Sequence, residues 1–493
     1  MILNMPILLL ILISAFIVKI PVLTAPIIGY FGSYQAVNAQ MAEMMLQSSG
    51  FADFMIPKLA MLVEGKPGLH LLYYPFGSFF AFLAQSLAGG EIDFWGRFQA
   101  AFFMLGNGYL VYTIAKHYYA ERTALLACFL FSFLPMNLLM GINFQNESVA
   151  IFLLLSTFVF LHRRSSGAAA IAGLCFSLAA IARIHFILVF PAFFLFLILK
   201  KRGWFQATLF CLCSGILLFA WYGFLYSVFK ESPDSVNTSI FSQAGDGRIL
   251  NHPLIRESRF YASLFDTLVL RSMTPVGFVF LLIGCMRAKW ESIVFYIWLL
   301  AGLACAILFP QKVFDHPFYL IFILPPAAMI AAEEIFKIAT KKKYFILTLM
   351  VFFLFSLRYY SPSAWSSWAP EAVAVRQMGR EVEAITKPHE FVIASNSTSP
   401  EFLYYTKRKG WPFDLQMARR KLENRVYIRN AQKSGYGNPI QWLEYLKSQG
   451  AAYFIVTEPV LLNKQESFAE YLTSKYSVID QTNPDMIIYD LRS

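Results

Sequence analysis

Apolar segments recur through the first 358 residues of the chain, separated by short polar connections. A helix needs about 17 to 25 residues to cross the hydrocarbon core of a bilayer, and its backbone must satisfy its own hydrogen bonds there. Segments near this length are therefore constrained to be membrane helices. We predict eleven of them: Met5–Val22, Arg97–Ala115, Ala124–Met140, Ser148–Leu161, Ala168–Ile181, Phe186–Leu199, Phe205–Phe229, Thr274–Met286, Ser292–Phe309, Phe318–Ile335 and Tyr344–Leu357.

The composition agrees with a membrane protein. Only 14% of the residues are charged and 57% are hydrophobic, whereas soluble proteins carry about 25% charged residues. The net charge of +11 does not indicate nucleic acid binding, because the Lys and Arg residues stand in short clusters between apolar segments. Clusters of this kind orient helices in a membrane.

Five basic clusters fall on alternate connections and predict the topology. The positive-inside rule places these connections, and with them the N-terminus, in the cytoplasm. The first loop, residues 30–96, and everything after Arg358 then lie outside. Leu69–Gly90 is apolar enough to span, but a crossing there would move every later cluster outside, so we expect it to lie in the outer interface. The clusters are Lys116 with Arg122, Arg163 with Arg164, Lys200 to Arg202, Arg287 with Lys289, and Lys341 to Lys343.

The chain changes character after its last apolar segment, where strand-like runs alternate with helical stretches. This alternation predicts a small α/β domain. We therefore expect a membrane all-α bundle over residues 1–358 and an extracytoplasmic soluble α/β domain over residues 359–493. The predicted strands are Phe391–Ala394, Tyr453–Val456 and Met486–Tyr489, and the predicted helices are Glu371–Ile385 and Pro439–Gln449.

Charged residues in the outer loops are the first candidates for a functional site. Lys58, Glu64 and Lys66 lie in the first loop, at the depth where a Lys side chain can bind a lipid phosphate. The simpler alternative is that they only solvate the loop. Arg256 and Arg259, in the loop spanning residues 231–271, are weaker candidates of the same kind.

Three further candidates stand at the outer ends of predicted helices. Glu147 begins the fourth helix, where a carboxylate either complements the helix N-terminus or acts as a base or metal ligand. Arg183 interrupts an apolar stretch and either binds a lipid phosphate or marks a turn. His316 precedes the tenth helix near the lipid headgroups, although a single histidine is usually structural.

The sequence lacks the motifs that would indicate other chemistry. It has no Walker A motif, no Gly-rich dinucleotide fingerprint, no zinc-protease pattern and no Gly-x-Ser-x-Gly elbow. No nucleotide cofactor is therefore indicated. Charges within the apolar segments are few, which disfavours a pump or channel. All six Cys residues lie in or beside apolar segments and are interpreted as packing residues.

Several motifs together resemble a known family. Asp53–Leu59 is similar to its Asp-Trp-x-x-Pro-Arg-Leu motif and Glu64–Pro67 to its Glu-Lys-Pro-Pro motif, and Arg97 heads the second predicted helix as in the family. The chain resembles the GT-C fold membrane glycosyltransferases of the protein O-mannosyltransferase and aminoarabinose-transferase superfamily, which are dolichyl-phosphate-mannose-protein mannosyltransferase-like. Further matching segments are Asn143–Glu147, Thr274–Gly277, His316–Tyr319 and Pro325-Pro326.

The resemblance implies transfer of a sugar, with inversion, from a polyprenyl-phosphate carrier to an envelope acceptor outside the cytoplasmic membrane. The acceptor is a glycan, a protein or a lipid such as lipopolysaccharide. Basic residues would hold the leaving phosphate, and a carboxylate would deprotonate the acceptor or bind a divalent metal. The substrate-binding candidates are Lys66, Lys58, Arg183, Arg256, Arg259 and His316, and the acidic candidates are Glu147, Glu64 and Glu43.

One feature of the family is missing. Its members have an Asp near the start of the first loop, whereas this chain has Tyr34 or Val37 there, depending on the alignment. Three readings follow: Glu43 or Glu64 substitutes as the base, the acceptor is an ionised phosphate that needs no base, or the chain is catalytically inactive. The competing function is a protein that binds or carries a polyprenyl-phosphate glycan without transferring it.

Overall fold

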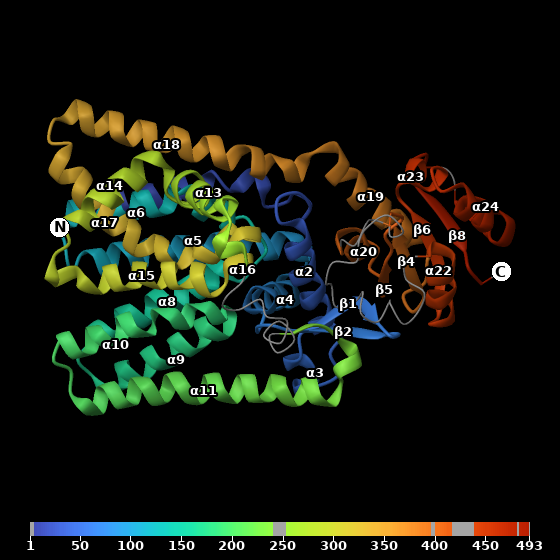
Figure 1. Cartoon of the computed structure of the whole chain (residues 1–493), viewed down its shortest axis with the longest axis horizontal. Coiled ribbons are helices and arrows are strands. Elements are labelled where there is room, and N and C mark those ends of the chain that lie inside the picture. Colours follow the sequence, from blue (N-terminus) through green and yellow to red (C-terminus); the bar gives the residue numbers. More distant parts are fainter. Residues whose placement is uncertain (1–3, 240–252, 396–399, 417–437, 481–482, 493) are drawn as a thin grey trace.

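The computed structural model describes residues 4–239, 253–395, 400–416, 438–480 and 483–492. In this part of the chain a long helical bundle stands beside a smaller domain of mixed helices and strands (Figure 1). The first helix, α1, begins at the end of the bundle that faces away from the smaller domain (Figure 1). The expected combination of a helical bundle and a C-terminal α/β domain is confirmed.

The predicted apolar segments form helices, but the count of eleven spans stays a prediction. Six stretches of the described residues are long and apolar enough to cross a membrane, and four further apolar helices are shorter. The bundle comprises α1 (Asn4–Ile17), α5 (Ile92–Ala115), α6 (Glu121–Phe133), α7 (Pro135–Met140), α8 (Glu147–His162), α9 (Ser166–Ala182), α10 (Phe190–Leu199), α11 (Trp204–Glu231), α13 (Ser258–Asp266), α14 (Thr274–Met286), α15 (Ile293–Leu308), α16 (Pro310–Asp315), α17 (Leu324–Ile338) and α18 (Lys342–Trp365).

Two boundaries differ from the prediction. Helix α5 begins at Ile92, so Arg97 lies within the helix and not at its head. The segment predicted as Ala124–Met140 is divided into α6 and α7, because Pro135 has no N–H to continue the hydrogen-bond ladder of α6.

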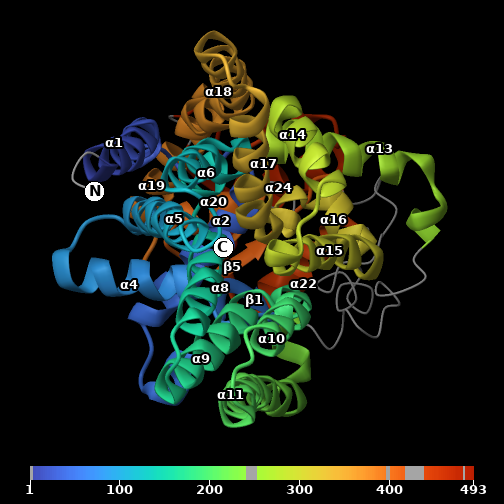
Figure 2. The same ribbon diagram turned by 90° about the vertical axis from the view of Figure 1, so that its left-hand side faces the viewer.

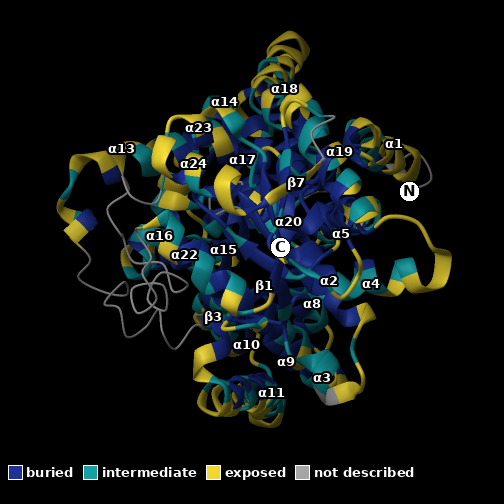
Figure 3. Ribbon diagram, turned by 90° about the vertical axis from the view of Figure 1, so that its right-hand side faces the viewer, coloured by how far each residue is buried: buried dark blue, intermediate teal, exposed yellow. Residues whose placement is uncertain are grey.

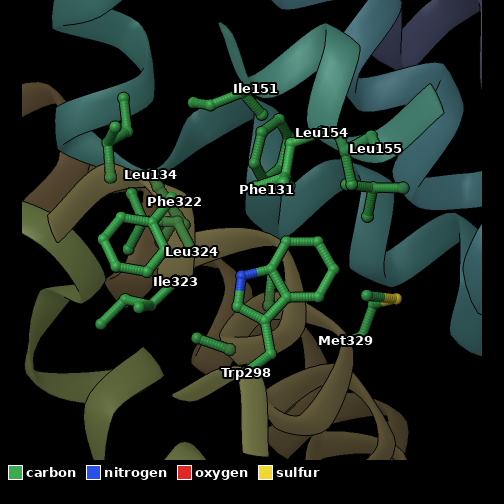
Figure 4. Packing of buried hydrophobic residues seen from close by; sticks show 14 of the residues in the cluster. Phe131, Leu134, Ile151, Leu154, Leu155, Trp298, Phe322, Ile323, Leu324 and Met329 are labelled. Atoms are coloured by element: carbon green, nitrogen blue, oxygen red, sulfur yellow. The ribbon is translucent and has the colours of Figure 1, made fainter. Parts of the chain in front are cut away.

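Aromatic and branched side chains fill the centre of the bundle. The Trp298 side chain is fully buried, and the rings of Phe193 and Phe158 meet it edge to face at centroid distances of 5.2 and 6.1 Å. Figure 4 shows Trp298 among other side chains of the same core, such as Leu155 and Met329. The peripheral helices are different: Phe219 on α11 is 79% exposed, and exposed positions recur on peripheral helices such as α1, α11 and α18 (Figure 3). Helices of this kind present apolar side chains to lipid.

The five basic connections gather at one end of the bundle, where α1 begins (Figure 2). Because they share this end, the alternation predicted from charge is consistent with the fold. Side-chain contacts join each of these connections to a neighbouring one. These contacts are His117 stacked on His162, Lys200 over Tyr118, Tyr118 against Phe295, Arg287 paired with Glu334, and Phe336 against Phe345.

The first loop folds into two layers at the other end of the bundle. Its helices are α2 (Gly32–Leu46), α3 (Phe51–Met55) and α4 (Phe76–Ala88), and its strands β1 (Lys58–Val63) and β2 (Lys66–Leu71) form a hairpin. The segment expected as one interfacial helix over Leu69–Gly90 is therefore a strand end followed by α4. Glu64 and Gly65 make the hairpin turn with φ of 49° and 73°, as two-residue hairpins require.

This hairpin joins the sheet of the C-terminal domain. The strand order is β3-β2-β1-β5-β4-β6-β8-β7, and β1 meets β5 in parallel where Met61 pairs with Gly410. The sheet therefore crosses the predicted boundary between residues 358 and 359, and so does helix α18. The other strands are β3 (Val236–Ser239), β4 (Phe391–Ser395), β5 (Gly410–Pro412), β6 (Ala451–Val456), β7 (Ser477–Asp480) and β8 (Ile487–Asp490).

The strands and helices predicted for the C-terminal domain are confirmed. Strands β4, β6 and β8 coincide with the three predicted runs within two residues at each end. The predicted helices correspond to α19 and α22. The helices of this domain are α19 (Pro370–Ile385), α20 (Glu401–Tyr405), α22 (Pro439–Ser448), α23 (Pro459–Asn463) and α24 (Glu466–Lys475).

Candidate active site

Polar and aromatic side chains from separate parts of the chain meet at the end of the bundle opposite the basic connections. They converge because α2 begins there, β2 and α9 end there, and α8 and the 3-10 helix Pro317–Ile323 begin there. The residues concerned are Tyr34 (α2), His70 (β2), Tyr73 (after β2), Glu147 (α8), Arg183 (after α9), His185 (3-10 helix Ile184–Val189), His316 (before the 3-10 helix) and Tyr319 (within it).

A buried ion pair lies at the centre of this cluster. Arg183 Nη2 is 2.5 Å from Glu147 Oε1, and the two side chains are only 7% and 2% exposed. Arg183 ends α9 by adopting an extended backbone, and Glu147 begins α8, where the helix dipole favours its charge. Burying two charges costs free energy that their attraction does not always repay. A pair retained in this position is therefore a candidate for function.

Other polar atoms around the pair have no partner in the described structure. Arg183 Nε and the Nε2 atoms of His70 and His185 are buried without a hydrogen bond. The guanidinium also lies over the Tyr73 ring, 4.6 Å from its centroid. Because most buried donors and acceptors in proteins are hydrogen-bonded, several unpartnered ones beside one arginine indicate a place for a bound polar group.

Tyr34 and His316 form a second pair beside the first. The Tyr34 hydroxyl lies 2.5 Å from His316 Nε2, and the Phe318 ring packs against both side chains at 5.8 and 5.6 Å. Arg183 lies over the same Phe318 ring at 6.0 Å. Burial, reinforced by the charge of Lys312, lowers the pKa of His316 to about 4. The imidazole is therefore neutral near pH 7.

An apolar pocket of about 560 Å³ begins next to the cluster, between α3, α4, α9 and α11. Tyr74 connects the two: its N–H donates to the Ile181 carbonyl, two residues before Arg183, and its carbonyl accepts from the Asn146 side chain, beside Glu147. The pocket is lined by Phe51, Met55, Tyr74, Phe76, Phe79, Leu178, Ile181, Leu217, Ala220, Trp221 and Phe224.

The candidate residues of the first loop lie elsewhere. Glu64 and Lys66 are exposed at the hairpin turn, where Gly65 faces Gln449 of the C-terminal domain. Lys58 is paired with Asp53. Among the described residues, no ion pair joins any of these three to Arg183 or Glu147, so their assignment to the donor phosphate or to proton transfer stays a prediction.

The remaining candidates are also separate from the cluster. Glu43 is paired with Lys407 of the C-terminal domain, and burial, which outweighs the attraction of Lys407, raises the pKa of Glu43 to about 7. Arg256 is exposed, and Arg259 is exposed and paired with Glu257. Of the nine candidates named from the sequence, the structure brings together Glu147, Arg183 and His316.

The described residues do not fit a divalent metal site. Within them, no three His, Cys, Asp or Glu side chains gather closely enough to hold a metal ion. The Glu147 carboxylate is in addition already paired with the Arg183 cation, and that cation repels a metal. These side chains therefore do not provide a metal site.

Sequence reasoning missed His70, Tyr73, Tyr319 and the pairing of Tyr34 with His316. One signal was present: His70 with Tyr73, and His316 with Tyr319, repeat a His-x-x-Tyr spacing at the N-terminal ends of two apolar segments. His185, two residues after Arg183, stacks on Tyr319 at 4.6 Å, and the Arg183 guanidinium lies over the Tyr73 ring, so both repeats contribute to the same cluster.

Comparisons with known proteins relate part of the chain to one family. The model of a family described as dolichyl-phosphate-mannose-protein mannosyltransferase matches residues 67–226. These residues include Tyr73, Glu147, Arg183 and the pocket-lining part of α11. No curated protein sequence is significantly similar to the chain.

Solved structures of similar fold include the following three. ArnT from Cupriavidus metallidurans bound to undecaprenyl phosphate has a TM-score of 0.66 and 13% identity, over 98% of this chain and 97% of that one. The Archaeoglobus fulgidus oligosaccharyltransferase in its apo form has a TM-score of 0.56 and 11% identity, over 91% and 69%. Arabinofuranosyltransferase AftD from Mycobacteria has a TM-score of 0.56 and 12% identity, over 98% and 40%. The resemblance inferred from the motifs is confirmed.

Proposed function

We propose that this chain, which has the fold of the GT-C membrane glycosyltransferases, transfers a sugar from a polyprenyl-phosphate carrier to an envelope glycan, lipid or protein. The names of its structural neighbours support this donor class. The ArnT structure is described as bound to undecaprenyl phosphate, and an AglB structure with a TM-score of 0.51 as containing a dolichol-phosphate.

The buried Arg183, beside an apolar pocket, is the observation that carries the proposal. A polyprenyl phosphate needs a cation for its phosphate and an apolar surface for its chain. Arg183 retains an unpartnered Nε in the cluster, and guanidinium groups bind phosphate with paired N–H donors. The pocket begins at Ile181, two residues away. Carrier phosphate at Arg183 thus places the carrier chain in the pocket.

Glu147 holds the Arg183 side chain in position in this proposal. Without Glu147, Arg183 would be a buried cation with no counter-charge, which is strongly destabilising. With it, the guanidinium is fixed beside the phosphate that leaves when the sugar is transferred, and a fixed cation stabilises the charge that develops on that phosphate. A single displacement by the acceptor inverts the configuration at the anomeric carbon.

The proposed location is the cytoplasmic membrane, with the N-terminus inside and the C-terminal domain outside. The basic connections at one end and the site at the other support this orientation. A reporter fused after Lys343 is expected in the cytoplasm, and one fused after Arg492 outside. The opposite result would reverse the assignment.

The experiment compares three arginine and lysine variants in nanodiscs. We expect Arg183→Ala to weaken binding of undecaprenyl phosphate at least tenfold and to reduce transfer from a panel of polyprenyl-phosphate sugars at least a hundredfold. Arg202→Ala is the matched control, because Arg202 donates to the Leu161 and His162 carbonyls at the opposite end of the bundle. Lys66→Ala tests the assignment made from the sequence. Equal binding by Arg183→Ala and the wild type would refute the proposal.

One observation favours a second function, that of a non-catalytic carrier-binding protein. Tyr34 lies beside the ion pair, in the part of the loop where the family has a carboxylate. Binding of undecaprenyl phosphate at Arg183, with no transfer from any donor in the panel, would establish this function instead.

A further inference from the structure

We infer that Tyr34 and His316 form a proton relay that deprotonates the acceptor hydroxyl in place of a carboxylate base. The inference rests on the proposed sugar transfer and concerns how that transfer proceeds. Tyr34 is the group that touches the acceptor, and His316 acts through it.

The hydrogen-bonding of the pair gives the direction of the relay. The distance of 2.5 Å between Tyr34 Oη and His316 Nε2 is short for a hydrogen bond between neutral groups. The backbone of Asp315 also hydrogen-bonds the imidazole. The ring nitrogen facing that backbone therefore carries the proton, and Nε2 accepts from the Tyr34 hydroxyl. A tyrosine that donates its proton in this way presents its oxygen lone pairs to a further donor.

The position of the pair fits a role in transfer. Tyr34 and Arg183 pack against the same Phe318 ring, at 5.8 and 6.0 Å. The Tyr34 side chain therefore lies beside Arg183, in the same cluster as the phosphate site proposed there.

The carboxylates considered from the sequence are committed to other contacts. Glu147 is paired with Arg183, Glu43 is paired with Lys407, and Glu64 is exposed at the hairpin turn. Asp315, next to His316, is exposed and accepts a hydrogen bond from Gln311. A hydroxyl acceptor still loses a proton when its oxygen bonds to carbon, and the Tyr34–His316 pair is placed to receive it.

The step balances without a further reactant. The acceptor oxygen forms a bond to the anomeric carbon, and the bond from that carbon to the carrier phosphate breaks, with its electron pair leaving on the phosphate beside Arg183. The acceptor proton passes to Tyr34 Oη as the Tyr34 proton passes to His316 Nε2. The imidazolium then returns its proton through Tyr34 to the released phosphate or to water.

The charges around the pair favour a neutral imidazole before the reaction. Lys312 and Arg183 disfavour a proton on His316, Asp315 favours one, and burial disfavours it most. The Tyr34 hydroxyl is in turn faced by Tyr319, Tyr73, Arg183 and Asp315, and burial raises its pKa. At neutral pH the tyrosine is thus protonated and the histidine is free to accept.

The test uses Tyr34→Phe and His316→Gln in the full chain. Phe keeps the ring packing without the hydroxyl, and Gln accepts a hydrogen bond without taking a proton. We expect each variant to lose a hundredfold or more in transfer rate, the double variant to lose no more than either alone, and carrier binding to stay within twofold. Tyr360→Phe and His162→Gln are the matched controls, because they remove a buried hydroxyl and an imidazole elsewhere in the bundle.

Titration of His316 distinguishes the relay from a purely structural role of Tyr34, because a structural role would leave the pKa of His316 unchanged. In a protein with isotope-labelled histidines, of which there are seven, the His316 signal should titrate below pH 5 and shift upward in Tyr34→Phe. Full transfer by either single variant, or multiplicative losses in the double variant, would overturn the relay alone. Absence of transfer by the wild type from every donor would instead refute the proposed function.

Discussion

The Tyr405 hydroxyl donates a hydrogen bond of 2.7 Å to the Asp93 carboxylate, across 312 residues of sequence. Tyr404 donates to the other oxygen of the same carboxylate at 2.5 Å. Both tyrosines and the aspartate are buried. Asp93 belongs to the first turn of α5, whereas the tyrosines belong to α20, so this contact fastens the C-terminal domain onto the end of the bundle opposite the basic connections.

Asp93→Asn should loosen this attachment. Hydrogen bonds to a charged group contribute about 1.5 to 3 kcal/mol each, and the amide replaces one acceptor oxygen by a donor. We expect a lower midpoint of thermal unfolding in detergent and faster proteolysis of the C-terminal domain. The control is Glu91→Gln, which removes an ion pair to Arg380 between the same two parts. That pair is exposed, so its loss should change little.

Arg97→Lys should also destabilise the fold, although it conserves the charge. The Arg97 guanidinium is fully buried and donates to the carbonyls of Pro26 and Ile142 and to the Ser367 hydroxyl, at 2.6 to 3.2 Å. An ammonium group lacks the planar fork that reaches these acceptors together. We expect a loss on the order of 2 kcal/mol or more, since buried acceptors are left unpaired. An unchanged melting midpoint would show that the acceptors find other partners.

The stability of the protein should depend on pH through Glu43. Its pKa is raised to about 7 in the folded chain from an ordinary value of 4.5, so the folded state holds a proton that the unfolded state has lost. The free energy of unfolding therefore falls as pH rises from about 4.5 to about 7, by up to roughly 3 kcal/mol. Glu43→Gln should flatten this part of the curve of melting midpoint against pH. A curve that keeps its slope in the variant would assign the effect to other groups.

A larger side chain in the apolar pocket should weaken the binding of polyprenyl phosphates with long chains. Ala220 lines this pocket, and Ala220→Trp is expected to weaken undecaprenyl phosphate binding about tenfold, with little effect on a short-chain prenyl phosphate that contacts Arg183 alone. Ile216→Trp is the control, because Ile216 lines a separate apolar groove between α10 and α11. Equal weakening by both variants would mean that the carrier chain does not occupy the pocket.

The sequence was sufficient to predict the helices and several strands. Leu443 and Leu446 on α22, or Phe454 and Val456 on β6, belong to local patterns whose period reveals the element. The hairpin was missed because its strands lack such a local signal. Leu59–Val63 is a single apolar run, and β5, the neighbour of β1 on the side away from β2, is separated from it by most of the chain.

Individual residues of the candidate site could be predicted from the sequence, but the contacts between them could not. Glu147 and Arg183 each stood out as charges at the ends of apolar segments, yet their pairing depends on how α8 packs against α9. Tyr34 was interpreted only as the place of a missing carboxylate. Its hydrogen bond to His316, 282 residues away, is a tertiary contact that no local pattern contains.

The pairing of β1 with β5 also sets an order on biosynthesis. The hairpin is synthesised before most of the bundle helices, whereas Gly410–Pro412 follows only after the last of them. During that interval β1 has an open edge, with unpaired backbone groups that attract other strands. Residues 58–63 therefore need protection from other strands while the chain is still being made.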